Sequence, residues 1–507
     1  MHNAGSVPEG RERLEEVLRN CEQAITQGSG HPEAYNGRGN ALQDLGRFDE
    51  AVASYDKAIA LKPGYAHAYS NRGNALKALN RFEEAIESYG KAIALKPDYA
   101  GAYNNRGTVL KALQRFDEAL ESYEKAIALM PDRAELYSNR GNALQGLRRF
   151  DEAIASYEAA IALKARHAEA YNNRGVALRE LKRFDEAMTS FDKAIAPKRD
   201  YAEAIWNKAL LHLLTGRFDL GWRGYEARKD KKEPVGNRAF AKPLWLADAD
   251  ISGKTILVHW EQGLGDVIQF CRYIRLLEDA GARVIFAVQE TLRTLMSGLD
   301  AKARIVDIDD PALVFDFHCP LMSLPLAFRT DLATIPNARY LCADEKKMAA
   351  WERRLGKTSK PRIGVVWSGR AVPDPSRSME LERFSRLFDP RFEFISLQKE
   401  VRDTDRAWLE QGPVVHFGSA LEDFSDTAAL CCLMDIVVSI DTSVAHLAGA
   451  LGVPVWVLLP WSSDWRWMLD RDDSPWYPSM RLFRQQARGD WDGVLRRVAR
   501  ELESLFG

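Results

Sequence analysis

Two short segments combine residue types that could act on a phosphorylated ligand. In IDTSVAHLAGALG (440–452), an apolar strand is predicted to end at Ile440, and a helix of small residues follows it. Asp441, Thr442 and Ser443 are residue types that start helices. A helix start presents unpaired backbone N–H groups and a positive dipole end, which suits a phosphate or diphosphate. Asp441 would repel that anion, so we expect it to cap the helix or to accept a hydrogen bond from a sugar hydroxyl.

The same segment also fits a purely structural function. An ordinary strand-to-helix turn uses the same residue types, and His446 would then face the sheet. The pattern alone leaves both interpretations open.

The second segment is Gly263-Leu-Gly265-Asp266, which follows an apolar run. Its two glycines allow the backbone to turn tightly and to approach a ligand. The Asp266 carboxylate could act as a general base, which must lie within about 2.6–3.2 Å of the acceptor hydroxyl. Alternatively, Asp266 only caps a helix, a contribution of about 1 kcal/mol. His318, which follows another predicted strand end, is the alternative base, although a lone histidine is more often structural.

Three further positions could contact a nucleotide sugar, although each could equally belong to a surface loop. One predicted strand ends in Ser368, Gly369 and Arg370, and the arginine could contact a diphosphate. Gln398 ends the next strand and could bond a nucleobase edge through both ends of its amide. Arg466 lies between two tryptophans and could cover the donor or the acceptor.

The sequence gives little support for a metal or a redox cofactor. Asp248-Ala-Asp250 and Asp307-Ile-Asp309 have the DxD form that can bind a divalent ion. The first lies in a linker and the second at an ordinary strand end. We therefore expect that both DxD sequences occur by chance and bind no metal. His and Cys do not cluster with ligand spacing. The glycine segment is not a complete GxGxxG, so we expect no nicotinamide cofactor.

Composition narrows the class of protein. The formal net charge is −2 and the pI is about 6.6, so there is no electrostatic sign of nucleic-acid binding. Six cysteines without a CxxC pattern suit a reducing compartment. Apolar runs fall short of the roughly 18 residues that span a bilayer. We therefore expect a soluble cytoplasmic protein without a transmembrane segment.

The elements that must position these residues are strands alternating with helices, which implies parallel sheets with right-handed crossovers. A polar segment at 344–361 separates two such series, so we expect two Rossmann-type domains with ligands at the carboxyl ends of their strands. Residues 490–506 are predicted to form a terminal helix. The predicted strands lie at 255–260, 283–289, 304–309, 313–318, 362–369, 392–398, 414–418, 435–441 and 454–460.

The chain before these strands repeats with a period of 34 residues. Its phase is marked by Tyr35, Tyr69, Tyr103, Tyr137 and Tyr171, and by RFDEA-like strings at Arg47, Arg81, Arg115, Arg149 and Arg183. The period resembles the tetratricopeptide repeat (TPR), an α-helical pair that stacks into a superhelix and binds other polypeptides.

Five asparagines share one register of the repeat: Asn71, Asn105, Asn139, Asn173 and Asn207. An amide both donates and accepts, so such a ladder could hold the backbone of an extended peptide. It resembles the asparagine ladder of O-GlcNAc transferase. The alternative is that these side chains are solvated or bond local backbone.

The α/β half resembles glycosyltransferase family 9, the heptosyltransferases. DTSVAHLAGALGVP is similar to that family's donor-binding signature, and WEQGLGDVIQF (260–270) is similar to its amino-terminal segment. The resemblance spans roughly 254–500 and implies the GT-B fold. By position, Asp266 matches the catalytic aspartate, and Asp441, Thr442, Ser443 and His446 match the donor loop. Ser443 stands where the family usually has glycine, and the loop 461–467 also differs from the family. The identity of the sugar donor is therefore not fixed by the resemblance.

The layout of a TPR arm before a GT-B half resembles protein O-GlcNAc transferases and flagellin glycosyltransferases. It implies a TPR array at 11–228, a linker at 229–252, an acceptor domain at 253–343 and a nucleotide-sugar domain at 344–507. The implied activity is inverting, metal-independent transfer of a sugar to a Ser or Thr hydroxyl of a protein held by the array. The alternatives are a saccharide- or lipopolysaccharide-directed transferase and a non-catalytic TPR scaffold.

Overall fold

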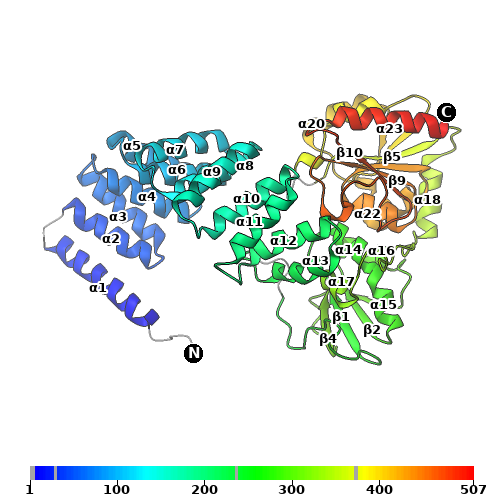
Figure 1. Cartoon of the computed structure of the whole chain (residues 1–507), viewed down its shortest axis with the longest axis horizontal. Coiled ribbons are helices and arrows are strands. Elements are labelled where there is room, and N and C mark those ends of the chain that lie inside the picture. Colours follow the sequence, from blue (N-terminus) through cyan, green and yellow to red (C-terminus); the bar gives the residue numbers. More distant parts are fainter. Residues whose placement is uncertain (1–5, 28–30, 234–237, 370–374) are drawn as a thin grey trace. The chain divides into compact units, whose positions relative to one another are not determined.

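The computed structural model in Figure 1 describes residues 6–27, 31–233, 238–369 and 375–507. The chain forms two compact units, Met1–Arg199 and Asp200–Gly507. The first unit, called the repeat array below, is helical. The second unit contains helices and two parallel sheets. Within the described ranges, no helix combines the length and the apolar character that crossing a membrane would require.

The repeat array consists of helix pairs that pack on their neighbours. One core cluster runs from Leu18 through Leu76 and Tyr89 to Val109, so the buried surface is continuous from one pair to the next. The helices are α1 (Ser6–Thr26), α2 (Pro32–Asp44), α3 (Phe48–Leu61), α4 (Ala66–Ala78), α5 (Phe82–Leu95), α6 (Ala100–Ala112), α7 (Phe116–Leu129), α8 (Ala134–Gly146), α9 (Phe150–Leu163), α10 (Ala168–Glu180) and α11 (Phe184–Ile195).

A glycine in the first helix of each pair faces an aromatic ring in the second. A Cβ on Gly73 would lie 2.6 Å from the ring of Tyr89, which is completely buried. Gly39, Gly107, Gly141 and Gly175 face Tyr55, Tyr123, Tyr157 and Phe191 in the same way. The repeated glycine therefore lets the two helices of a pair approach closely.

The turn inside each pair contains a residue with positive φ. Asn80, Gln114, Arg148 and Lys182 have φ between 58° and 60°, whereas Gly46 occupies the same register in the first pair. Side chains with a Cβ are strained in this region. Four of the turns thus adopt a conformation that glycine would adopt more easily.

The helices α12 (Ala202–Leu214) and α13 (Phe218–Tyr225) continue the repeat phase but belong to the second unit. The division at residues 199 and 200 thus differs from the boundary expected at 228. The indole of Trp222 is 2% exposed, donates to the carbonyl of Thr330 at 3.1 Å, and lies 5.3 Å from the ring of Trp465. This degenerate repeat is packed as part of the α/β unit.

The first sheet is parallel, with the strand order β3-β2-β1-β4. Its strands are β1 (Thr255–His259), β2 (Arg283–Ala287), β3 (Arg304–Val306) and β4 (Phe317–Pro320). The helices of this part are α14 (Leu264–Phe270), α15 (Ile274–Asp279), α16 (Glu290–Met296) and α17 (Leu324–Ala327). The buried side of the sheet includes Leu257, Ile285, Ala287 and Val306.

The second sheet is also parallel, with the order β10-β9-β8-β5-β6-β7. Its strands are β5 (Arg362–Val366), β6 (Glu393–Ser396), β7 (Val414–His416), β8 (Ile436–Ile440), β9 (Val455–Leu459) and β10 (Met480–Arg484). Its helices are α18 (Glu345–Leu355), α19 (Leu381–Phe384), α20 (Asp403–Gln411), α21 (Phe424–Cys432), α22 (Ser443–Ala450) and α23 (Trp491–Phe506).

The expected parallel α/β architecture is confirmed. Nine predicted strands correspond to β1 to β9, while β10 was not predicted. Two arginines in MRLFR weaken the apolar pattern of β10, yet Met480, Leu482 and Phe483 are buried.

Candidate functional site

One cleft of the second unit has a volume of about 680 Å³ and brings together most of the predicted site residues. Small-molecule sites typically measure about 300–1,000 Å³. The walls come from the segments that follow β1 in the first sheet and β5, β6, β8 and β9 in the second. The predicted residues that line the cleft are Gly263, Gly265, Asp266, Ser368, Gly369, Gln398, Asp441, Thr442, Ser443, His446 and Arg466.

The two sequence motifs meet where helices α14 and α22 begin. A Cβ on Gly265 would lie 3.1 Å from Cδ2 of His446 and 3.4 Å from the Cα of Ser443. Only a residue without a side chain fits this approach comfortably. Gly263 has an ordinary φ of −70°, so its backbone conformation does not require glycine. The expected requirement for glycine applies to Gly265, where it comes from the packing of α14 against α22. The close approach places Asp266 near the segment 441–446.

The carboxylate of Asp266 is engaged on both oxygens. Oδ2 accepts from the backbone N–H of Gly263 at 2.8 Å, which is the predicted cap of α14. Oδ1 accepts from the guanidinium of Arg466. Burial raises the pKa of Asp266 above its ordinary value, and the charge of Arg466 opposes the rise. The hydrogen bond that caps the start of α14 is present in the structure. The function of Asp266 as a general base stays a prediction.

Arg466 links the first turns of α14 to the loop after β9. Its Nε donates to Oε1 of Gln269 at 2.7 Å, and its Nη1 donates to Oδ1 of Asp464 at 2.8 Å. The guanidinium lies 4.4 Å from the ring centroid of Trp465. Burial lowers the pKa of Arg466, but the carboxylates of Asp464 and Asp266 outweigh it, so the pKa is raised. Arg466, which is predicted to cover a bound ligand, is therefore held in place by bonds to α14 and to its own loop.

The segment after β8 starts helix α22 with Thr442 at the N-cap position. The Thr442 side chain makes no capping bond, and its hydroxyl lies 3.2 Å from that of Ser439. The first-turn N–H groups of a helix have no intrahelical partners, so this end can receive an anion. Asp441 precedes the cap, which corrects the expectation that it caps the helix itself. Burial and the charge of Asp464 raise the pKa of Asp441 to about 6.

His446 forms a wall of the cleft. Its Nδ1 lies 3.0 Å from the hydroxyl of Tyr477, and its ring stacks on Trp467 with centroids 5.2 Å apart. Burial, together with the charges of nearby arginines, holds the pKa of His446 well below 6.5. The imidazole is thus neutral and fixed in orientation.

Gln398 holds the loop that follows β5. Its Oε1 accepts from the backbone N–H groups of Trp367 and Ser368 at 2.7 and 3.0 Å, and its Nε2 donates to the Ser368 hydroxyl at 2.9 Å. Both amide ends are thus used within the chain, which differs from the predicted contact with a nucleobase. Gly369 lies beside the start of α22, since a Cβ there would be 3.3 Å from Cγ2 of Thr442. Arg370 lies outside the described residues.

His318 lies inside β4 and does not line the cleft, which differs from its predicted position after a strand end. Its Nδ1 is 3.4 Å from Nε2 of His259, and its ring is 4.6 Å from that of Phe240. Burial lowers the pKa of His318. This environment does not support His318 as the alternative base.

Several cleft residues were not predicted. Arg377 and Lys399 add cations, and Asp464 adds a carboxylate. Trp206 and Leu210 of α12 also line the cleft. Asp464 lies in the loop 461–467, whose sequence differs from the resembled family and does not by itself mark this carboxylate. Trp206 lies in a helix that continues the repeat pattern, so its local sequence does not indicate that it lines a cleft.

The asparagine ladder is a bonded network in the repeat array. Nδ2 of Asn105 donates to Oδ1 of Asn74 at 2.9 Å, and Tyr89 donates to the same oxygen at 2.8 Å. Asn71, Asn139 and Asn173 donate to Asn40, Asn104 and Asn142 in the preceding repeats. The ladder therefore helps to stack the repeats, and peptide binding by it stays a prediction. Asn207 lies in α12, within the second unit.

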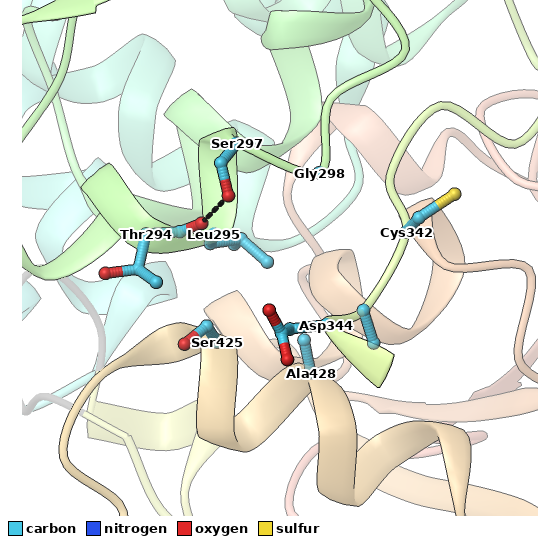
Figure 2. A pocket seen from close by; sticks show the side chains of 9 residues that line it. Thr294, Leu295, Ser297, Gly298, Cys342, Asp344, Ser425 and Ala428 are labelled. Carbon is cyan, nitrogen blue, oxygen red and sulfur yellow. Dashed lines mark hydrogen bonds between the residues drawn. The ribbon is translucent and has the colours of Figure 1, made fainter. Parts of the chain in front are cut away.

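A second cavity, shown in Figure 2, has a volume of about 210 Å³ and contains none of the predicted residues. It lies between α16, α21 and the segment 342–344. The hydroxyl of Ser297 donates to the carbonyl of Thr294 at 2.7 Å at one side of it. Among the residues that the structure describes, no group of three or more His, Cys, Asp and Glu could hold a metal ion.

Comparisons with known proteins identify the repeats. Residues 39–80 and 73–114 match the family described as TPR repeat, and residues 98–166 and 138–202 match families described as tetratricopeptide repeat. The array is built of tetratricopeptide repeats. This class of repeat is a protein-interaction scaffold, so the matches favour the scaffold interpretation, which had been the alternative, over transferase activity.

Protein FlbA of Caulobacter vibrioides is 26% identical over 322 residues, which cover 58% of this chain and 54% of FlbA. The chain thus spans about half the length of this curated relative. A match over 58% of 507 residues is longer than Met1–Arg199, so the similarity extends into the second unit.

Two solved structures illustrate the likeness to other repeat proteins. YrrB, described as a TPR protein with an unusual peptide-binding site, is 27% identical, with a TM-score of 0.33 and coverage of 36% of this chain and 95% of YrrB. The MamA protein is 27% identical, with a TM-score of 0.32 and coverage of 34% and 94%.

Proposed function

We propose that the second unit is an inverting glycosyltransferase of the GT-B type, which transfers a sugar from a nucleotide-sugar donor to an acceptor. The observation that supports this most is the convergence of GLGD and DTSVAH on one cleft. These segments lie about 175 residues apart in the sequence, yet Gly265 allows the starts of α14 and α22 to touch.

The donor's diphosphate would lie at the first turn of α22, near Thr442 and Ser443. A helix start supplies N–H donors and the positive end of the helix dipole. Arg377 and Arg466, which line the same cleft, supply positive charge. These groups would stabilise the nucleoside diphosphate as it leaves, so the reaction needs no metal cofactor.

Asp266 would act as the base for the acceptor hydroxyl. As the hydroxyl oxygen bonds to the anomeric carbon of the sugar, Asp266 takes the proton. The bond from that carbon to the diphosphate breaks, and the diphosphate keeps the electron pair. Attack from the side opposite the leaving group inverts the configuration of the anomeric carbon.

The acceptor would be a Ser or Thr hydroxyl of a protein that the repeat array holds. Support comes from the class of the repeats and from the asparagine ladder, whose amides could bond a peptide backbone in addition to their partners in the preceding repeats. An acceptor that is a saccharide or lipopolysaccharide would use the same cleft without the ladder.

A non-catalytic scaffold is the second candidate function. The comparisons favour it because the family matches cover the repeats. The two functions differ in one measurable property, which is whether the cleft turns over a nucleotide sugar.

Turnover can be tested with the full chain and a panel of UDP-, GDP-, ADP- and CMP-sugars. We expect one donor to stabilise the protein against heat and to release its nucleotide slowly by hydrolysis. Release should accelerate when an acceptor is added. A protein that responds to none of these donors would be a scaffold.

A further inference from the structure

We propose that Arg466 exchanges partners during the reaction. In the free protein it pairs with Asp266, and when the donor binds it turns to the diphosphate and releases Asp266 to act as the base. This inference rests on the proposed function and adds a positioning residue that couples donor binding to activation of the base.

The contacts of Arg466 divide into two groups. Asp464 lies on the same loop as Arg466 and would move with it, whereas Asp266 and Gln269 belong to α14. The side chain of Arg466 is only 10% exposed, yet it lines the cleft. It can therefore exchange its partners on α14 for a ligand in the cleft while it keeps its partner on the loop.

The free arrangement leaves one polar group unsatisfied beside Arg466. Gln269 is completely buried, and its Nε2 has no hydrogen-bond partner among the described residues, while its Oε1 accepts from Arg466. Buried polar groups without partners are costly in folded proteins. The contacts that hold Arg466 against α14 are therefore incompletely hydrogen-bonded in the free protein.

A diphosphate is the ligand chemistry that can draw Arg466 away. It carries more negative charge than one carboxylate, and its oxygens match the planar fork of a guanidinium. Thr442 and Ser443 at the start of α22 line the same cleft, so a diphosphate there would lie within the same cavity as Arg466.

The exchange would make Asp266 a stronger base. A guanidinium beside a carboxylate favours its ionised form and occupies one of its oxygens. After the exchange, Asp266 keeps the bond from the Gly263 N–H but loses the cation, so its proton affinity rises. The base would thus be activated only when a donor is present.

A double-mutant cycle on ligand binding tests the exchange directly. Binding of UDP, GDP and ADP is measured by calorimetry for the wild type, Asp266→Asn, Arg466→Gln and the double variant. If Arg466 must leave Asp266, Asp266→Asn removes a competitor and should tighten binding about three- to thirtyfold, which lies within the coupling range of contacting residues. The same change should tighten binding by a clearly smaller factor in the Arg466→Gln background, where only the removal of a negative charge contributes.

The Arg466→Gln background distinguishes the partner exchange of Arg466 from the simple removal of the negative charge of Asp266. Deleting a negative charge near an anion tightens binding whether or not Arg466 is present. Equal or larger tightening by Asp266→Asn in the Arg466→Gln background would therefore overturn the exchange. No tightening in either background would overturn it as well, because the ion pair would then persist with ligand bound.

Two controls keep the outcome interpretable. Arg466→Lys retains the charge without the fork, and thermal unfolding of every variant shows whether the cleft is intact. Asp266→Asn should tighten binding in the Arg466→Lys background by less than in the wild type. If no nucleoside diphosphate binds the wild type, the proposed function and the exchange both fail, whereas binding without coupling overturns only the exchange.

Discussion

In the repeat array the ladder asparagines recur at a spacing of 34 residues, whereas the polar side chains of the cleft belong to no repeat. Asn105, Asn139 and Asn173 each donate to another asparagine of the preceding repeat. Asp266 and Arg466, by contrast, are brought together from positions 200 residues apart. Recognition by the array would be spread over many weak contacts, and the chemistry of the cleft would depend on single residues. Substitutions in the two regions should therefore differ greatly in effect.

The largest effect is expected at Asp266. Asp266→Asn keeps the shape of the side chain but loses basicity, so the rate of transfer should fall about 10²–10⁴-fold. Steady-state kinetics with a saturating donor would measure it. His318→Gln is the matched control, because His318 lies in β4 away from the cleft, and it should change the rate less than threefold. If His318→Gln causes the larger loss, the base has been assigned to the wrong residue.

The next effect concerns pH. Because the pKa of Asp441 is raised to about 6, the carboxyl is ionised at pH 7.5 and protonated at pH 5. Protonation removes a negative charge beside the expected diphosphate, so affinity for a nucleotide sugar should increase as the pH falls through this range. The increase should be about tenfold, corresponding to ~1.4 kcal/mol.

Asp441→Asn serves as the control for that dependence. This variant should bind the nucleotide sugar more tightly at pH 7.5, and its affinity should be nearly flat between pH 5 and 7.5. A nucleotide sugar is the suitable ligand because its esterified diphosphate does not titrate in this range. An unchanged pH profile in Asp441→Asn would assign the dependence to another group.

A smaller effect is expected for the asparagine ladder. One hydrogen bond contributes about 0.5–1.5 kcal/mol, so a single Asn→Ala change should be nearly silent. The combined Asn105→Ala, Asn139→Ala and Asn173→Ala variant should weaken transfer to a protein acceptor and leave donor hydrolysis unchanged.

The control for the ladder removes the acceptors of the same bonds, and with them the acceptors of the Tyr89 and Tyr157 hydroxyls. Asn74→Ala, Asn104→Ala and Asn142→Ala remove the acceptors of these three bonds. Both triple variants should lower the stability of the array, but only the ladder variant should lose protein acceptors. Equal losses in the two variants would mean that the ladder only stacks the repeats.

The smallest effect is expected at a turn. Gln114 has φ of 60° in a register where Gly46 occurs in the first repeat. Gln114→Gly should relieve strain and stabilise the array by about 0.5–1 kcal/mol. Gln114→Ala keeps a Cβ and should give no such gain. Thermal unfolding of the two variants compares them directly.

Local patterns made the strands and the repeats predictable, because each follows from a periodicity within a short stretch of sequence. Apolar runs indicated β1 to β9, and the tyrosine register and the RFDEA-like strings indicated the helix pairs. β10 was not predicted because Arg481 and Arg484 interrupt its apolar pattern. The sequence also placed GLGD and DTSVAH at the ends of strands, where ligands are expected.

Long-range contacts could not be predicted in the same way. Nothing near Gln398 indicates that its amide is taken by the loop at 367–368, and nothing near Arg466 indicates its bond to Asp266. The pairing of ladder amides between repeats and the packing of Trp222 into the α/β unit likewise depend on side chains far apart in sequence.

Nucleotide binding at the start of α22 tests the central claim most directly. Calorimetry with UDP, GDP and ADP would compare the full-length wild type with a Thr442→Glu and Ser443→Glu variant. Thr358→Glu and Ser359→Glu provide the control, because they make the same change at an exposed Thr-Ser pair. We predict that the wild type and the control bind one nucleotide equally and that the α22 variant binds none. Unchanged affinity in the α22 variant, or no binding by the wild type, would contradict the account.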